Sequence, residues 1–407
     1  MSIISTLVVP LSWKLCPFGR VAPRVQVTGR PDLEPLSVFL DEGVVPRSSR
    51  EDNHNQLGED LGKYLIVQPG DIVFNKLRTW QGGLGVSRHE GIVSPAYFVC
   101  RPTSEYDPRY LHYLLRSQPY LQELTRISKW MPPSQFDIGW EQLRLLPVLA
   151  PHQVVQSAIA DYLDRETARI DTLIAKKQRM MDLLDARRAA LIEEIIRGLV
   201  ERYGAIPLKH AVRRVEVGIV ITPAAWYSDE GILALRGLNV RPGELVLDDV
   251  VKISEEGHRL NQKSELHTGD VVVVRTGQTG TAAIVPESLD GCNCIDLVIV
   301  RPSTIHLPKF LEFVLNSDWT QKHVEAYSVG TIQSHFNVGA MKEVPVPAAP
   351  LTEQRAAAND LTLATAALDQ LRQKLAMQVD LLVQRRQALI TAAVTGELEI
   401  PVAEAVA

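Results

Sequence analysis

The sequence has few cysteines, and none of them lies in a functional cysteine motif. Only four of the 407 residues are cysteine, and no two of them are spaced as Cys-x-x-Cys. Cys292 and Cys294 flank a single residue, which is the wrong spacing for a zinc knuckle. A chain of this length needs no disulfide bonds for stability, so we expect free thiols in or near a core.

The chain also lacks a long hydrophobic run and an excess of positive charge. No apolar stretch approaches the roughly 18 residues that a membrane span requires. Residues 1–16 have no basic region of the kind that begins a signal peptide, so we expect a cytoplasmic protein without membrane contact. The net charge is −5, so binding of nucleic acid would need local basic loops or a partner that shares the phosphate contacts.

Signatures of covalent catalysis are absent as well. Residues 276–280 contain glycines but lack the frame of a phosphate-binding P-loop, and neither a G-x-S-x-G nor an H-E-x-x-H motif occurs. The histidines show no metal-ligand spacing, and the Asn/Asp-Pro-Pro-aromatic tetrapeptide of amino-methyltransferases is missing. Asp71 and Asp270 each follow a glycine, and we interpret them as turn residues. We expect no metal site and no catalysis by this chain alone.

What the sequence does contain is an internal repeat. Residues 183–192 match residues 381–390 at an offset of 198, and the same offset pairs Pro147 with Pro345. Each copy carries an apolar residue at every seventh position, with one lysine as the exception. This seam consists of Leu163, Ile170, Lys177, Leu184 and Leu191 in the first copy and of Leu361, Leu368, Leu375, Leu382 and Leu389 in the second.

The seven-residue period predicts two long helices, over about residues 154–197 and 352–394, which end near Gly198 and Gly396. At 1.5 Å per residue each would be about 65 Å long. Because pairing buries both seams, we expect an antiparallel coiled coil with helix contacts through the leucines of the seam. A second seam is expected at Leu173 and Met180 in the first helix and at Ala364 and Leu371 in the second.

The segments before the two helices resemble each other more weakly. Residues 68–74 and 267–273 both read as a Gly-Asp turn that enters a buried strand, and Arg101-Pro102 matches Arg301-Pro302. We therefore expect an α+β protein with two similar mixed α/β domains, related by a pseudo-twofold axis. The expected domains cover residues 1–150 and 201–350, and the expected helical spacers cover residues 151–200 and 351–407.

Each predicted buried strand opens into a polar loop whose residue types suit DNA. Arginine pairs with guanine, asparagine and glutamine pair with adenine, and glycine-flanked amides approach phosphates. We expect DNA contacts from Asn75, Lys76, Arg78, Thr79, Trp80 and Gln81 in the first domain and from Arg275, Thr276, Gln278 and Thr279 in the second. Further candidates are Arg47, Arg50, Thr331 and Gln333.

Several motifs around the second helix resemble one known family. Residues 344–350 are rich in proline and lead into Glu353-Gln354-Arg355, residues 384–390 lie near the end of the helix, and Thr395-Gly396-Glu397 follow them. With the repeat, these motifs resemble the specificity subunit of type I restriction–modification systems over essentially the whole chain. The first copy departs from the pattern, since residues 151–156 lack the Glu-Gln pair and are shifted by one residue.

The resemblance implies a non-catalytic subunit that gives a DNA-modifying complex its sequence specificity. Each domain would be a target recognition domain that reads one half of a split site in double-stranded DNA. The helices would set the gap between the halves and dock two methyltransferase subunits, and restriction–translocase subunits would join them. S-adenosylmethionine, and ATP with magnesium, would be bound by those partners and not by this chain. An insertion around residues 351–355 is expected to change the gap alone.

Two alternatives stay open at this stage. One is a similar subunit of a methylation-only system or of another restriction system that is not type I, which the neighbouring genes for methyltransferase and restriction subunits would distinguish. The other is a coiled-coil scaffold with two protein-binding domains and no DNA role. An absence of salt-dependent affinity for duplex DNA would favour the scaffold.

Overall fold

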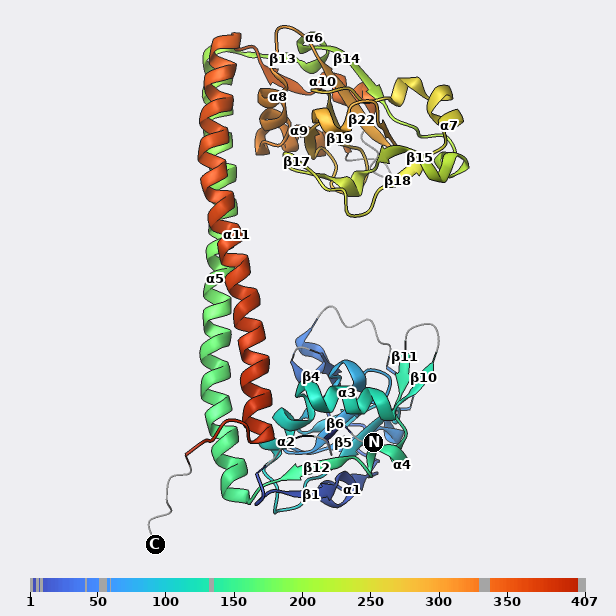
Figure 1. Ribbon diagram of the computed structural model, residues 1–407, viewed down its shortest axis with the longest axis vertical. Coiled ribbons are helices and arrows are strands. Elements are labelled where there is room, and N and C mark those ends of the chain that lie inside the picture. Colours follow the sequence, from blue (N-terminus) through green and yellow to red (C-terminus); the bar gives the residue numbers. More distant parts are fainter. Residues whose placement is uncertain are drawn as a thin grey trace. The chain divides into compact units, whose positions relative to one another are not determined.

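The structure is a computed structural model that divides into two compact units. It describes residues 3–4, 7, 10–40, 42–50, 57–58, 60–131, 135–328 and 337–401, without the side chains of residues 325–328. Unit 1 comprises Met1–Lys177 and Met377–Ala407, and unit 2 comprises Gln178–Ala376. Each unit is a mixed α/β domain joined to parts of two long helices, α5 (Gln153–Tyr203) and α11 (Leu351–Thr395) (Figure 1).

The domain of unit 1 contains short strands and four short helices. Its strands are β1 (Lys14–Pro17), β2 (Arg24–Val25), β3 (Leu36–Phe39), β4 (Gly43–Pro46), β5 (Leu65–Val67), β6 (Ile72–Asn75), β7 (Leu84–Val86), β8 (Gly91–Val93), β9 (Tyr97–Cys100), β10 (Lys129–Met131), β11 (Gln135–Asp137) and β12 (Pro147–Ala150). Its helices are α1 (Phe18–Val21), α2 (Pro108–Leu115), α3 (Gln118–Ile127) and α4 (Trp140–Leu143).

The domain of unit 2 has a similar order of elements. Its strands are β13 (Ala205–Pro207), β14 (Val212–Val217), β15 (Tyr227–Leu235), β16 (Val240–Arg241), β17 (Glu244–Leu245), β18 (Val251–Ile253), β19 (Val271–Val274), β20 (Ala282–Ile284), β21 (Asn293–Cys294), β22 (Leu297–Pro302) and β23 (Pro345–Pro347). Its helices are α6 (Leu208–Ala211), α7 (Glu255–Leu260), α8 (Pro308–Leu315), α9 (Asp318–Ser328) and α10 (Val338–Glu343).

The central sheets of the two units have the same topology. The strand order is β2-β9-β6-β7 in unit 1 and β14-β22-β19-β20 in unit 2, and neighbouring strands are antiparallel in both. The register also agrees, since Val73 lies opposite Val99 in unit 1 and Val272 lies opposite Ile299 in unit 2. The shared fold that the sequence repeat predicted is therefore present in the described residues of both domains.

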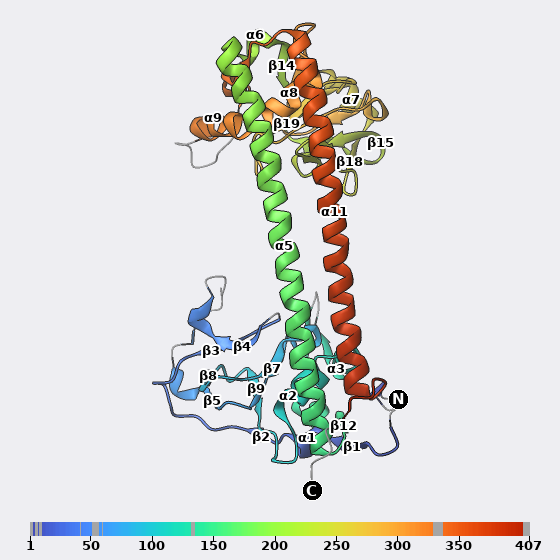
Figure 2. The ribbon, with the colours of Figure 1, turned by 90° about the vertical axis from the view of Figure 1, so that its left-hand side faces the viewer.

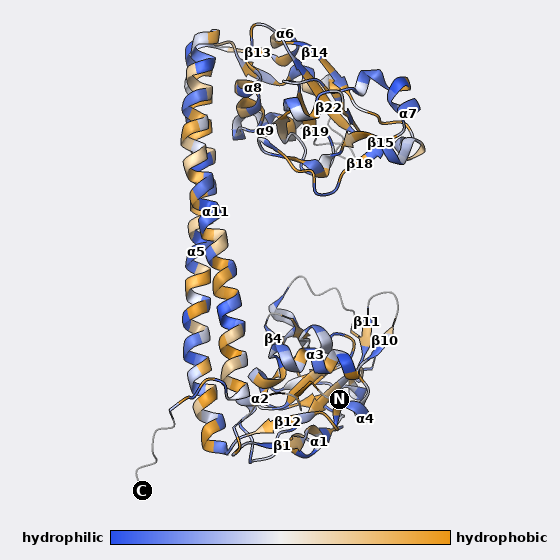
Figure 3. Ribbon diagram, in the orientation of Figure 1, coloured by the Kyte–Doolittle hydropathy of each residue, from blue (hydrophilic) through white to orange (hydrophobic). Residues whose placement is uncertain are grey.

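Both faces of each central sheet are buried, which explains why the strands read as continuous apolar runs. In unit 2, Val271 and Val273 pack into one core, whereas Val272 and Val274 pack into another on the opposite face. Strands β19 and β22 are accordingly coloured as hydrophobic in Figure 3. The cysteines lie in or beside these cores as free thiols, with Cys16 partly exposed.

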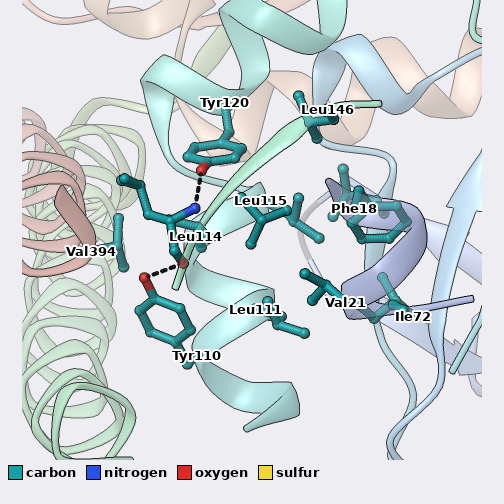
Figure 4. Close-up of a cluster of buried hydrophobic side chains, with 14 of the residues drawn as sticks. Phe18, Val21, Ile72, Tyr110, Leu111, Leu114, Leu115, Tyr120, Leu146 and Val394 are labelled. Atoms are coloured by element: carbon teal, nitrogen blue, oxygen red, sulfur yellow. Dashed lines mark hydrogen bonds between the residues drawn. The ribbon is translucent and has the colours of Figure 1, made fainter. Parts of the chain in front are cut away.

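The core of unit 1 joins the domain to both long helices. Two buried tyrosines hold strand β12 between them, because Tyr110 donates to the carbonyl of Leu149 at 3.0 Å and Tyr120 accepts from its N–H at 2.9 Å (Figure 4). Leu163 of α5 and Val394 of α11 belong to the same core. The core of unit 2 is built in the same way from Ile192, Ile196 and Leu199 of α5 and Ala357, Ala358 and Leu361 of α11.

The seven-residue seam of both long helices is turned inward. Leu163, Ile170, Leu361 and Leu375 are buried, and the other leucines of the seam are half-buried. Helices α5 and α11 lie side by side within each unit (Figures 1 and 2). The seam thus supplies apolar contacts to the helix pair in both units.

The predicted second seam was wrong. Leu173, Met180 and Leu371 are 40%, 48% and 44% exposed. After Ile170, for example, apolar residues occur both three and four positions further on, at Leu173 and Ile174, and Ile174 is the less exposed of the two. Thr167 and Thr365, which lie four positions after Leu163 and Leu361, are each only 5% exposed.

Ion pairs and hydrogen bonds between the helices show that they are antiparallel in each unit. Residues further along α5 pair with residues nearer the start of α11. Most of these side chains are exposed, so each pair stabilises the fold by at most about 1 kcal/mol and serves mainly to fix register. The pairs are Asp171–Arg386 at 2.9 Å and Lys177–Gln378 at 2.5 Å in unit 1, and Arg188–Asp369 at 3.3 Å and Arg202–Glu353 at 3.6 Å in unit 2.

Helix α5 continues past Gly198, where the sequence predicted its end. Apart from its own helix backbone, no atom of the described residues lies within 4 Å of the position that a Cβ at Gly198 would take, so this glycine costs only its intrinsic penalty of about 1 kcal/mol. The helix stops before Gly204, which has a φ of +75° and donates its N–H to the carbonyl of Val200 at 2.8 Å. Helix α11 ends before Gly396, with a φ of +80°, as predicted.

Candidate nucleic-acid interface

In unit 1 the polar loop of residues 75–83 joins β6 to β7 and is closed by its own backbone. The N–H of Asn75 donates to the carbonyl of Gly83, and the N–H of Gly83 donates to the carbonyl of Arg78, both at 2.8 Å. A Cβ at Gly83 would lie 2.7 Å from the Cβ and carbonyl oxygen of Arg78, so only glycine fits there. This close approach turns the loop back tightly and leaves the side chain of Arg78 exposed.

Three of the predicted DNA-binding residues of unit 1 meet at one open cavity. Arg47, which follows β4, and Asn75 and Arg78, which follow β6, line a cavity of about 390 Å³ together with Tyr97 and Gln135. The remaining wall contains Leu36, Ser37, Leu57, Tyr64, Leu77, Ser94 and Ala96. The cavity therefore combines guanidinium, amide and phenol groups from four separate segments.

The polar groups of this cavity differ in how firmly they are held. The Oδ1 of Asn75 accepts from the N–H of Leu77 at 3.2 Å, and its Nδ2 donates to the hydroxyl of Tyr97 at 3.4 Å. Burial raises the pKa of Tyr97, so its hydroxyl keeps its proton at neutral pH. Among the residues that the structure describes, the Arg78 side chain has no hydrogen-bond or ion-pair partner and can reorient toward a ligand.

Other predicted residues of the loop have different surroundings. Thr79 is fully buried and donates its hydroxyl to the carbonyl of Asn75 at 2.7 Å, so its prediction as a DNA contact was wrong. Trp80 donates its indole N–H to the carbonyl of Leu77 at 3.1 Å, and Gln81 is exposed. Thr79 thus closes the loop from within and offers no exposed surface.

Lys76 and Arg50 are engaged in electrostatic contacts within unit 1. The ammonium of Lys76 lies 4.0 Å from a carboxylate oxygen of Asp137. Arg50 lies over the ring of Phe39, 4.3 Å from its centroid, and 3.7 Å from the carboxylate of Glu42. Any DNA contact by Arg50 would have to compete with both of these partners.

The polar loop of unit 2, residues 275–280, is held by one carboxylate. Asp296 accepts from Arg275 Nη1 at 2.9 Å and from the hydroxyl of Thr276 at 3.1 Å, and it adopts a positive φ of +52°. Arg275 is only 18% exposed in its side chain, whereas Gln278 is exposed and Thr279 is half-buried. Thr331 and Gln333 lie outside the described residues.

At the start of each central strand, opposite the end that carries the polar loop, the same ion pair anchors the preceding turn. Arg101 pairs with Asp71 at 2.7 Å, and Arg301 pairs with Asp270 at 2.8 Å. Each aspartate also accepts a backbone N–H from the residue three positions before it. Asp71 and Asp270 are turn residues, as predicted.

A second repeated network fixes the start of each long helix to its domain. Gln156 accepts from the N–H of Asp107 and donates to the carbonyl of Pro151, both at 2.9 Å. Gln354 accepts from the N–H of Leu307 at 2.9 Å and donates to the carbonyl of Ala349 at 2.8 Å. The two glutamines are equivalent at the 198-residue offset, so the interpretation of the first copy as shifted by one residue was wrong.

Sequence reasoning missed Tyr97, Gln135 and Asp296 as parts of these surfaces. Tyr97 begins a strand, and neither it nor Gln135 is part of a motif, although Gln135 precedes Phe136-Asp137-Ile138, which repeats in the sequence as Phe336-Asn337-Val338. Asp296 joins the loop only through the pairing of β21 and β22 with distant strands. These residues are brought in by tertiary structure, which local sequence patterns do not encode.

The described part of the chain contains neither a metal-binding cluster nor a membrane-spanning helix. No group of three or more histidine, cysteine, aspartate or glutamate side chains there could hold a metal ion. No helix among those residues is long and apolar enough to cross a membrane.

Comparison with known proteins identifies relatives of one kind. No protein-family model matches the chain. Over 275 residues it is 22% identical to the type I restriction enzyme EcoBI specificity subunit of Escherichia coli, and the match covers 61% of this chain and 57% of that subunit. The match therefore spans little more than half the length of the relative.

One solved structure extends the similarity of fold to nearly the whole chain. A chain solved to explain complex assembly and conformational transition of the type I R-M system aligns with a TM-score of 0.66 and 15% identity, covering 96% of this chain and 100% of that one. The HsdS subunit from Thermoanaerobacter tengcongensis aligns with a TM-score of 0.49, 15% identity and coverage of 97% and 99%. The predicted resemblance and the predicted mixed α/β fold with two long helices are confirmed.

Proposed function

We propose that this chain is the non-catalytic specificity subunit of a type I restriction–modification complex. The observation that carries the proposal is the repeated domain plan. Two domains share sheet topology, register and anchoring networks, yet the loops that leave β6 and β19 differ in sequence and in their contacts. A common scaffold with divergent loops suits the reading of two different DNA half-sites.

The proposed complex distributes the chemistry among several chains. This chain binds double-stranded DNA, and two methyltransferase subunits dock on it and bind S-adenosylmethionine. Restriction–translocase subunits, which use ATP and magnesium, join the assembly. The similarity to the EcoBI specificity subunit supports this assignment.

The paired helices offer a surface to the methyltransferase subunits. Leu183, Leu363, Met377 and Leu381 are 55%, 74%, 59% and 62% exposed on the long helices. Exposed apolar residues that recur along a helix are typical of a protein-interaction face. In the proposed complex the helices also set the number of unread base pairs between the half-sites.

Duplex affinity as a function of salt concentration tests the DNA role directly. The purified chain, assembled with the methyltransferase subunit, is titrated with duplex DNA by fluorescence anisotropy at several salt concentrations. We expect the logarithm of the affinity to fall linearly with the logarithm of the salt concentration, because phosphate contacts release counterions. Absence of any salt-dependent duplex affinity would favour a coiled-coil scaffold for proteins instead.

A further inference from the structure

The hairpin formed by β10 and β11 exposes large apolar side chains in unit 1. All three residues of β10 are exposed, with Trp130 at 49% and Met131 at 40%. The hairpin is a two-stranded ribbon that pairs with no further described strand, and it follows helix α3 (Figure 1). Exposed neighbouring apolar side chains of this size indicate an interaction site.

An aromatic cluster fixes this hairpin to the polar loop of unit 1. The ring of Phe136 lies 4.9 Å from the ring of Trp130 and 5.2 Å from the ring of Trp80, measured between centroids. Trp80 belongs to the polar loop, and its indole N–H is anchored on that loop. Trp130 is therefore held at a defined place next to the polar loop that carries Trp80 and Arg78, while about half of its surface stays exposed.

The charges around the hairpin favour a polyanion as the occupant. Lys129 is exposed on β10, and it has no ion-pair partner within the described ranges of the chain. Lys76 and Arg78 lie on the adjoining loop, and Gln135 of β11 lines the cavity that contains Arg78. The acidic residue of the hairpin strands, Asp137, is opposed by Lys76. An apolar surface bordered by the cations Lys129 and Arg78 suits bases and phosphates together.

We propose that the β10–β11 hairpin is an aromatic wedge that stacks against bases of duplex DNA at the half-site bound by unit 1. Trp130 contacts the base stack, Met131 supports it, and Lys129 contacts a neighbouring phosphate. Apolar wedges of this kind partly unstack a base step and bend the duplex. The inference rests on the proposed function and adds to it a residue that deforms DNA.

The test compares Trp130→Ala with Trp130→Phe in the full chain assembled with the methyltransferase subunit. Leu145→Ala is the matched control, since Leu145 is a 62% exposed apolar residue of unit 1 outside the hairpin. The duplex carries the site mapped by methylome sequencing, with 2-aminopurine placed in turn at each step of the half-site assigned to unit 1. Anisotropy measures affinity, 2-aminopurine fluorescence measures unstacking, and size-exclusion chromatography measures assembly.

We expect Trp130→Ala to weaken duplex binding by about 5- to 100-fold and to abolish the rise in 2-aminopurine fluorescence. Trp130→Phe should retain most of both signals, and Leu145→Ala should behave as the unchanged protein. Unaltered affinity and fluorescence in Trp130→Ala would overturn the wedge and leave the specificity-subunit proposal standing. Loss of assembly with intact unstacking would also overturn it, by making the hairpin a protein contact. Absence of duplex binding by the unchanged complex would instead refute the proposed function.

Discussion

At the scale of single residues, Arg78 and Arg275 occupy matching loops but meet different surroundings. Arg78 is exposed beside an open cavity, whereas Arg275 is held by Asp296. An arginine that is already oriented loses less side-chain entropy when it pairs with a base. We therefore expect Arg275 to be the more selective reader and Arg78 the more adaptable one.

Substitution of either arginine tests its role as a base reader. Arg78→Ala or Arg275→Ala should each weaken specific duplex binding by about 1–3 kcal/mol and relax specificity at one base of one half-site. Titration with duplexes altered base by base measures both effects. Arg144→Ala, which removes an exposed arginine paired with Glu141, is the control, and changes within about 0.5 kcal/mol in all three variants would refute the reading role.

His112 gives unit 1 a dependence of stability on pH. Its Nδ1 accepts the N–H of Val86 at 3.3 Å, and burial, with Arg116, Arg88 and Arg386 nearby, lowers its pKa from 6.5 to about 3. Between these two pKa values the unfolded chain binds a proton at His112 and the folded chain does not. The contribution of neutral, buried His112 to the free energy of unfolding is therefore fully present above pH 6.5 and is lost as the pH falls toward 3. The full shift corresponds to about 3–5 kcal/mol.

The His112→Asn variant isolates this effect, because its amide oxygen still accepts a hydrogen bond but does not titrate. We expect its free energy of unfolding to fall less than that of the unchanged protein between pH 6.5 and 4.5. Chemical denaturation at a series of pH values measures the free energy of unfolding of both proteins. The contributions of their shared carboxylates cancel when one value is subtracted from the other. Parallel pH curves for the two proteins would show that His112 is protonated in the folded state.

At the scale of elements, a buried glutamine joins each long helix to its domain. Gln156 and Gln354 are 1% and 0% exposed, and each bonds backbone groups of two other segments. Removal of either side chain leaves buried backbone groups without partners, so Gln156→Ala and Gln354→Ala should each cost about 1–3 kcal/mol of stability. Denaturant midpoints measure the loss. The exposed Gln153→Ala should cost less than about 0.5 kcal/mol, and equal effects for all three would contradict the network's importance.

The two long helices show which features of the fold a sequence pattern can predict and which it cannot. A seven-residue period of leucines is a local pattern, so it predicted both helices and their antiparallel pairing. The second seam was not predictable, because Leu173 and Ile174 are both apolar and only the partner helix selects between them. The end of α5 was missed because the burial of Leu199 outweighs the weak helix propensity of Gly198.

Lengthening the helix pair tests its role as a spacer. An insertion around residues 351–355 would break the Gln354 network, so heptad insertions after Lys177 and after Ala376 are the cleaner change. Seven residues lengthen each helix by about 10 Å and preserve the seam. Each base pair occupies about 3.4 Å along the DNA axis, so 10 Å corresponds to about three base pairs. We expect a gap longer by about three base pairs with both half-sites unchanged. A mapped site with its original gap would exclude the spacer role.

At the scale of the whole molecule, the 198-residue repeat is the feature from which the rest follows. It was visible in the sequence because the helices keep their leucines and the domains keep their Gly-Asp turns. The binding surfaces were only partly predictable, since Tyr97, Gln135 and Asp296 reach their loops through strand pairing between distant segments. A net charge of −5 is compatible with the proposed complex, in which partner subunits would share the phosphate contacts.

Exchange of one domain, followed by methylome sequencing, tests the central claim most directly. Residues 1–150 are replaced by the equivalent domain of a relative with a different known site, and the modified chain is expressed with its methyltransferase subunit. We expect methylation at a two-part site in which one half has changed and the other half and the gap have not. Alteration of both halves, or of neither, would contradict the assignment of one half-site to each domain.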